Sequence, residues 1–266
     1  MKKRSSSHPP VPALRRLGFW LTAAALLASA FPIPPVPSAN ASLPAVPEPA
    51  PQSSPVVIAA FQHIAAPPTL RANQTILDHP MLNGNPNVLL FVTADYGTIG
   101  PYHEKPVGVW YDGIRWTIFN QDGSPMTPNV RFNVLAVKPG DHAYMHVAHL
   151  DNISGSMTSL DHPFLNGNPK ARLLVTPNWI GTYNPHVIGV RYEEQMGRWM
   201  IFNQDYQPMP EGAAFNVLIW DAIFDVTAPK VPYNWFPIDH PTAIHYPEIL
   251  VFVTQYWTGV ENNNEV

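Results

Sequence analysis

The sequence predicts an all-β protein: two tandem modules, each a small β-sandwich or partly closed barrel, followed by an incomplete third copy. A seventeen-residue stretch at residues 77–93 recurs almost unchanged at residues 160–176, and its opening returns at residue 238. Between these repeats, short runs rich in Val, Ile, Phe, Trp and Tyr alternate with clusters of Gly, Pro, Asn and Asp. This alternation is typical of strands separated by turns.

The N-terminus is predicted to be a secretory signal over residues 1–41. Five basic residues accompany an apolar run at residues 17–31, and small residues at 39–41 offer a cleavage site. The run is short and is soon followed by prolines, so we expect no stable membrane span after the signal is removed. The expected location is therefore outside the cytoplasm, either secreted or at the cell surface.

Residues 42–58 alternate proline with small and acidic residues and are expected to form an extended spacer. Without the signal, the chain keeps ten Lys and Arg residues against nineteen Asp and Glu residues. Nucleic acid is not expected as a partner, because phosphate binding needs a basic face. Cysteine is absent, so the modules must be stabilised by burial and hydrogen bonding.

The repeat places module one at residues 59–138 and module two at residues 142–221. The strings IFNQD and FNVL recur at an offset of 83 residues, whereas VGVWY and IGVRY are 81 residues apart. The difference falls in the loops, where changes of length are tolerated. A period of this size fits small domains better than solenoid repeats.

Four strands are expected in module one, at residues 87–93, 106–112, 115–121 and 130–137. Asp112-Gly113 supplies a hairpin turn between the second strand and the third. Five or six strands per module are expected in all, which implies a sandwich or a partly closed barrel.

The shared loop at residues 77–86 is interpreted first as turn chemistry. Its two Asn-containing dipeptides, Asn-Gly and Asn-Pro, are turn signals, and Asp78 is expected to accept backbone N–H bonds that hold the corner. The alternative is a Ca²⁺ site that uses the side-chain oxygens of Asp78, Asn83 and Asn85. Their spacing does not match an EF-hand loop, and no cofactor is predicted.

His79, His162 and His240 recur in all three copies and are expected to be hydrogen-bonded structural residues. No Ser or Cys occupies a matching position in both full modules, so no duplicated catalytic nucleophile is expected. Three histidines between residues 142 and 149 have a spacing that would suit a transition-metal site on a helix. Module one keeps only the central histidine of the three, and no metal ligands are predicted.

The most specific repeated motif is RWxIFNQD, in which amide and carboxylate side chains follow aromatic ones. These polar residues either close the next turn or form the rim of a sugar-binding surface, where an aromatic ring stacks on the sugar. An aromatic residue also follows each of the three VT pairs. The predicted ligand-binding residues are Tyr96, Trp116, Asn120, Asp122, Trp179, Trp199, Asn203, Asp205 and Trp257.

Together, the motifs HPxLNGNP, IGVxY, RWxIFNQD and FNVL resemble an uncharacterised domain found in tandem in secreted bacterial proteins, cyanobacterial ones among them. The resemblance covers both modules and the start of the third copy, from about residue 61. It implies an extracytoplasmic repeat protein without an established activity, and no catalytic residue is predicted. Arg191 stands where module one has Trp110, so a ligand surface is expected to differ between the copies.

The third copy, residues 222–266, keeps one apolar strand but lacks counterparts of the strands that follow it in the full modules. A strand without neighbours leaves unpaired backbone groups. We expect either that the sequence is part of a longer protein or that a second chain completes the module by strand addition. In the second case the protein would self-associate through residues 222–266.

The predicted function is a structural, adhesive or glycan-binding role, with an extracellular glycan or matrix component as the partner. The alternative is an extracellular hydrolase that acts on polysaccharide or peptide. Asp78 and Asp122 are the acids matched at fixed motifs in both modules, and nothing in the pattern brings them to one cleft. A non-catalytic role is therefore favoured over an enzyme.

Overall fold

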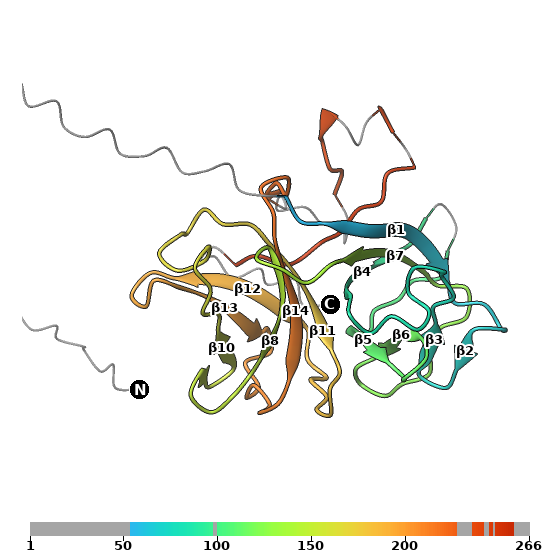
Figure 1. Cartoon of the computed structure of the whole chain (residues 1–266), viewed down its shortest axis with the longest axis horizontal. Helices are drawn as coiled ribbons and strands as arrows, with labels where there is room; N and C mark the ends of the chain where they lie inside the picture. Colours follow the sequence, from blue (N-terminus) through green and yellow to red (C-terminus); the bar gives the residue numbers. More distant parts are fainter. Residues whose placement is uncertain (1–53, 98–99, 228–235, 242–244, 247, 258–266) are drawn as a thin grey trace, which may run out of the picture. The chain divides into compact units, whose positions relative to one another are not determined.

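The computed structural model describes residues 54–97, 100–227, 236–241, 245–246 and 248–257, all within one compact unit of the chain. The expected signal, most of the expected spacer and the last residues of the third copy lie outside the described residues. The described residues form fourteen β-strands (Figure 1), which confirms the all-β prediction.

Module one has seven strands in two sheets. They are β1 (Val57–Ile64), β2 (Leu70–Arg71), β3 (Gln74–Ile76), β4 (Leu89–Asp95), β5 (Val107–Tyr111), β6 (Trp116–Asn120) and β7 (Arg131–Val137). One sheet has the antiparallel order β1-β7-β4, which is visible in Figure 1, and the other continues in the order β2-β3-β6-β5. The sequence predicts β4 to β7. It does not predict β2 and β3, which are too short to show a period.

Module two repeats this arrangement strand by strand. Its strands are β8 (Ala143–Val147), β9 (Ile153–Ser154), β10 (Met157–Ser159), β11 (Leu173–Asn178), β12 (Ile188–Glu193), β13 (Arg198–Asn203) and β14 (Ala214–Ile219). The sheets run in the orders β8-β14-β11 and β9-β10-β13-β12. The duplicated sequence therefore folds as a duplicated structure.

The predicted hairpin joins β5 to β6, with Tyr111 opposite Trp116. Gly113 has a φ of 102°, a conformation that side chains disfavour, so glycine suits this turn. The Asp112 carboxylate accepts the backbone N–H groups of Ile114 at 2.8 Å and Arg115 at 2.6 Å. Asp112 and Gly113 thus act together to reverse the chain.

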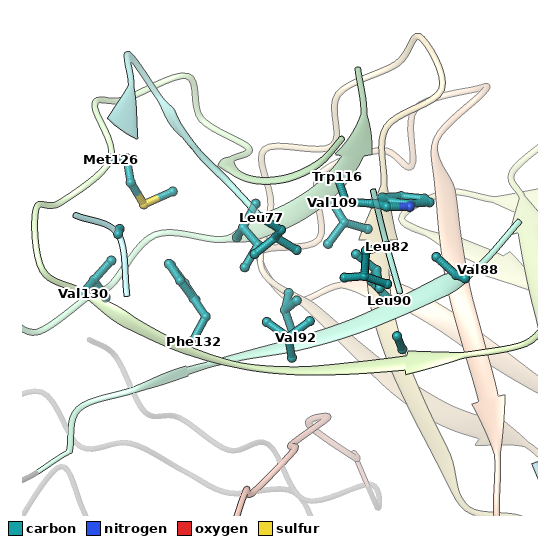
Figure 2. Packing of buried hydrophobic residues seen from close by; sticks show 14 residues of the cluster. Leu77, Leu82, Val88, Leu90, Val92, Val109, Trp116, Met126, Val130 and Phe132 are labelled. Carbon is teal, nitrogen blue, oxygen red and sulfur yellow. The ribbon is translucent and has the colours of Figure 1, made fainter. Parts of the chain in front are cut away.

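Each module has a hydrophobic core between its two sheets. In module one, Leu90 and Phe132 from the β1-β7-β4 sheet meet Trp116 from β6 (Figure 2), and Ile118 of β6 belongs to the same core. In module two, Val175, Phe215, Trp199 and Ile201 pack in the same way. Burying a large apolar side chain contributes about 1.5–3 kcal/mol, so each core is a substantial source of stability.

The two modules also share a sheet and a third hydrophobic cluster. β5 and β11 adjoin in parallel, which makes one seven-stranded sheet in the order β2-β3-β6-β5-β11-β14-β8. The shared cluster joins Phe91 of module one to Leu174 and Leu218 of module two. The prediction of two modules is confirmed, but their interiors are not independent.

Part of the third copy lies along module two. Residues 248–257, the third-copy segment, run beside β12, where Val190 and Tyr256 form a parallel bridge. The Val190 N–H donates to the Gln255 carbonyl at 2.8 Å, and the Trp257 N–H donates to the Val190 carbonyl at 2.9 Å. Among residues 248–257 this bridge is the only strand-like pairing, so the apolar strand expected in the third copy is not formed there, although the second module anchors the end of the segment.

Candidate functional site

The repeated DHPxLNG loop is held by side-chain hydrogen bonds. Asn83 donates from Nδ2 to Asp78 at 2.8 Å, and Asn83 Oδ1 accepts the backbone N–H of His79 at 3.3 Å. Arg115 lies 3.4 Å from the same Asp78 carboxylate. The expectation that Asp78 accepts backbone N–H groups needs correction, because Asn83 has that role. Asp78 instead links the loop to the start of β6.

The second module repeats this network. Asn166 donates to Asp161 at 2.8 Å, and Arg198 also pairs with this carboxylate. These two partners, Asn166 first, lower the pKa of Asp161 below its usual value. The oxygens of the loop are engaged in both copies, which favours the turn interpretation.

The histidine that follows the aspartate stacks on an aromatic ring in each copy. His79 lies over Phe61 with ring centroids 4.5 Å apart, and His162 lies over Tyr144 at 4.7 Å, both with an interplanar angle of 9°. His240 stacks on Phe224 at 4.2 Å. The rings pack within each copy, and Nδ1 of His79 and of His162 each accepts the backbone N–H two residues further on at 3.3 Å, as expected for hydrogen-bonded structural histidines.

A different pair of histidines is hydrogen-bonded to buried threonines. His63 Nε2 lies 2.7 Å from Thr75 Oγ1, and His146 Nε2 lies 2.7 Å from Thr158 Oγ1. Thr158 donates its own proton to Asn152 at 2.7 Å, so the neutral His146 ring donates from Nε2. Burial lowers the pKa of both histidines to about 4, because a charged ring would lose its hydration.

The stretch at residues 142–149 forms strand β8 and its flanks instead of a helix. His142 and His146 are buried, whereas His149 is exposed after the strand ends. Within the described parts of the chain, no three His, Cys, Asp or Glu side chains are grouped as metal ligands.

Four of the predicted ligand-binding side chains are buried. Trp116 is 3% exposed and Trp199 is 2% exposed, and both belong to the module cores. Their indole N–H groups donate to the carbonyls of Asn85 and Asn168, each at 2.9 Å. Rings held in this way support the fold and cannot serve as open stacking platforms.

Asn120 and Asn203 are also fully buried. Asn120 Nδ2 donates to the Pro125 carbonyl at 3.0 Å, and Asn203 Nδ2 donates to the Gln207 carbonyl at 3.0 Å. Both amides close the turn after their strand, which is the alternative that the sequence offers beside sugar binding. They are therefore not exposed for a ligand in this structure.

Asp122 and Asp205 lie in those same turns. Asp122 accepts the backbone N–H of Ser124 at 2.9 Å and lies 3.2 Å from Lys105 Nζ. Asp205 lies 2.6 Å from His186 Nδ1. The carboxylates are partly exposed but have local partners in both modules.

An aromatic hollow of about 380 Å³ lies where β5 of module one adjoins β11 of module two. It is lined by Pro86, Trp110, Tyr111, Trp116, Met145, Asn178, Trp179 and Ile180. Trp110 and Trp179 meet edge to face, with ring centroids 5.3 Å apart. Of the predicted residues, the hollow brings together Trp116 and Trp179. The sequence prediction missed Trp110. The signal that could have indicated it is the difference between Trp110 and its counterpart Arg191 in module two.

The predicted platform residues Tyr96, Trp179 and Trp257 occupy three different environments. Where Trp179 meets Trp110, Trp257 instead lies under the guanidinium of Arg191, 4.9 Å from the ring centroid. Tyr96 is 54% exposed and meets Tyr102 edge to face at 6.3 Å. The structure therefore places these three rings at separate sites.

No helix in the described ranges has the length and apolar character needed to cross a membrane.

Comparison with known proteins agrees with the duplicated architecture. No curated protein and no solved structure matches the sequence. A family model described as a domain of unknown function (DUF7452) matches residues 53–136 and again residues 127–219. Because these two matches cover more than half of the chain and correspond to the two seven-strand modules, the chain belongs to the DUF7452 family and carries the domain twice.

Proposed function

We propose that this is a secreted or cell-surface repeat protein that binds an extracellular glycan in the aromatic hollow and performs no reaction there. The observation that carries this proposal is the meeting of Trp110 and Trp179 at the wall of a hollow of about 380 Å³. Small-molecule sites have volumes of roughly 300–1,000 Å³ and combine apolar walls with a few polar groups.

The lining residues suit a neutral sugar. Aromatic faces stack on the apolar face of a pyranose, and Asn178 contributes an amide to the same wall. Trp179 carries a buried indole N–H that has no acceptor among the described residues. The chain has a formal net charge of −4, which disfavours polyanionic glycans and nucleic acid.

The hydrolase alternative gains no support from the repeated acids. Asp78 pairs with Arg115, and Asp122 pairs with Lys105 and accepts a turn N–H. The apolar run near the N-terminus supports export, and the excess of acidic over basic residues favours a glycan or matrix partner over nucleic acid.

The test is a glycan array that compares the full chain with the Trp110→Arg variant. Arg191 occupies the matching place in module two, so arginine is compatible with this position of the fold. We expect the variant to lose at least tenfold in affinity for any glycan that the full chain binds, because the stacking wall is removed.

Asp122→Asn serves as the control, since Asp122 does not line the hollow, and we expect its binding to be unchanged. The proposal fails if the full chain binds no glycan, or if Trp110→Arg binds as tightly as the original chain.

A further inference from the structure

Three equivalent hydrogen bonds join module one, module two and the third-copy segment in a closed cycle. Each runs from the backbone N–H of a valine in the VT pair to the threonine hydroxyl of the next copy. The bonds are Val92 to Thr176 at 3.1 Å, Val175 to Thr254 at 2.8 Å and Val253 to Thr93 at 3.1 Å. The third-copy segment therefore occupies the place that a third module would take.

A second set of contacts has the same cyclic order but is incomplete. Asn216 of module two donates to the Leu90 carbonyl of module one at 3.0 Å. Its counterpart Asn133 of module one donates to the Val251 carbonyl of the third-copy segment at 3.0 Å. The last bond of this set would come from the third copy and end in module two.

The ends of β11, of the third-copy segment and of β4 differ in whether a neighbouring strand covers them. The Trp179 N–H donates to the Val109 carbonyl of β5 at 2.9 Å, and the Trp257 N–H donates to the Val190 carbonyl of β12 at 2.9 Å. Tyr96 is the matching residue of module one. Along β11 the residues before Trp179 are buried, whereas along β4 Ala94 and Tyr96 are exposed.

The third-copy segment exposes the face that forms the core in the full modules. Val253 is 55% exposed, whereas its counterpart Val92 is 8% exposed. Ile249 and Val251 on the same side are exposed as well. The opposite side of the segment is covered, because Phe252 packs against the cluster that the two modules share.

We propose that these two features form one docking surface, and that a further DUF7452 module fills it. The docking surface consists of Tyr96 with the end of β4, and of Ile249, Val251 and Val253. A strand like β12 would lie along Tyr96, and a strand like β14 would cover the apolar face. This proposal is independent of the glycan proposal, which concerns the β5–β11 junction.

The chemistry of the incoming strand follows from the two junctions already filled. A Cβ on Gly108 or Gly189 would lie 2.9 Å from a phenylalanine ring of the next strand, so glycine belongs to the pattern. The incoming strand must therefore have Ile or Val, then Gly, then Val at the positions that match residues 107–109 and 188–190. A second copy of this chain is a poor donor, because its β5 edge adjoins β11 and its β12 edge adjoins the third-copy segment.

The test appends residues 180–219 of this protein to the full chain through a flexible linker, which presents the strands at millimolar effective concentration. Backbone hydrogen exchange is then measured at residues 95–97 and 249–256, leaving out Gly97, Ile249 and Val253, whose N–H groups already donate within this chain. We expect exchange at both places to slow at least tenfold compared with the unextended chain.

Two variants of the extended chain serve as controls. Val190→Pro in the appended copy removes the N–H that bonds across this junction, and we expect it to restore fast exchange at residues 95–97. Val253→Asp places a charge on the apolar face and should abolish protection there. Ile114→Asp, at an exposed turn position, should leave protection unchanged.

The proposal is overturned if the extension leaves exchange unchanged at both places. It is also overturned if the unextended chain already protects the measured amides, as a monomer or by self-association, because the surface would then be filled by this chain itself.

Discussion

At the scale of single residues, His63 and His146 show how the fold restricts charge. Each ring nitrogen lies 2.7 Å from a buried threonine hydroxyl, and burial lowers each pKa to about 4 from a usual value of 6.5. The unfolded chain therefore binds a proton more readily than the folded chain. Stability is fully present above about pH 6.5 and is lost as the pH falls towards 4.

We predict that the free energy of unfolding, measured by urea titration, falls between pH 7 and pH 5 by about 1–2 kcal/mol for the buried His146 and by less for the partly buried His63. The His146→Gln variant keeps a hydrogen-bonding side chain but does not titrate, so part of this fall should disappear. His245→Gln is the control, because His245 is exposed and is not among the causes of the pKa shift of His146. An identical fall in the original chain and in His146→Gln would contradict the prediction.

At the scale of elements, the sequence predicts those strands that have a clear composition. β4 to β7 are rich in β-branched and aromatic residues, and the Asp-Gly pair between β5 and β6 marks their hairpin. β2 and β3 are too short for any periodicity, and they form because β3 pairs with β6 and β2 pairs with β3. Trp116 could not be placed from the sequence, because β6 is apolar on both faces and every residue in it is buried.

The glycine of β5 is required by the strand beside it. A Cβ at Gly108 would lie 2.9 Å from Phe119 Cζ and 2.9 Å from Gln121 Nε2. We predict that Gly108→Ala lowers the free energy of unfolding by about 1–3 kcal/mol, as overpacking usually does. Gly140→Ala is the matched control, since no atom lies within 4 Å of its added Cβ. Equal effects of the two variants in urea titration would refute the steric explanation.

At the scale of the whole molecule, the repeat reveals two modules but not how they join. The apolar run of β4 holds the clue, because Leu90 and Val92 face the core of module one, whereas Leu89 and Phe91 face the shared cluster. A strand buried on both faces reads as a continuous apolar run, and a single sequence cannot show which neighbour covers each face. The aromatic hollow could not be predicted for the same reason, since it is lined by residues of both modules.

The shared cluster should couple the unfolding of the two modules. Phe91 is 1% exposed and packs with Leu174 and Leu218, whereas Phe132 belongs to the core of module one alone. We predict one calorimetric transition for the original chain. Phe91→Ala and Phe132→Ala should each cost about 3–5 kcal/mol. Phe91→Ala should also split the transition in two, because it removes the packing that joins the modules.

Phe132→Ala distinguishes coupling from simple destabilisation. Its cavity lies within module one and leaves the shared cluster intact, so both modules should still unfold together at a lower temperature. Two transitions in the original chain would show that the modules are independent despite their common sheet. If instead Phe91→Ala unfolds in a single transition like Phe132→Ala, then the coupling resides in other contacts between the modules, among them the β5–β11 pairing, the Trp110–Trp179 ring contact and the hydrogen bonds between copies.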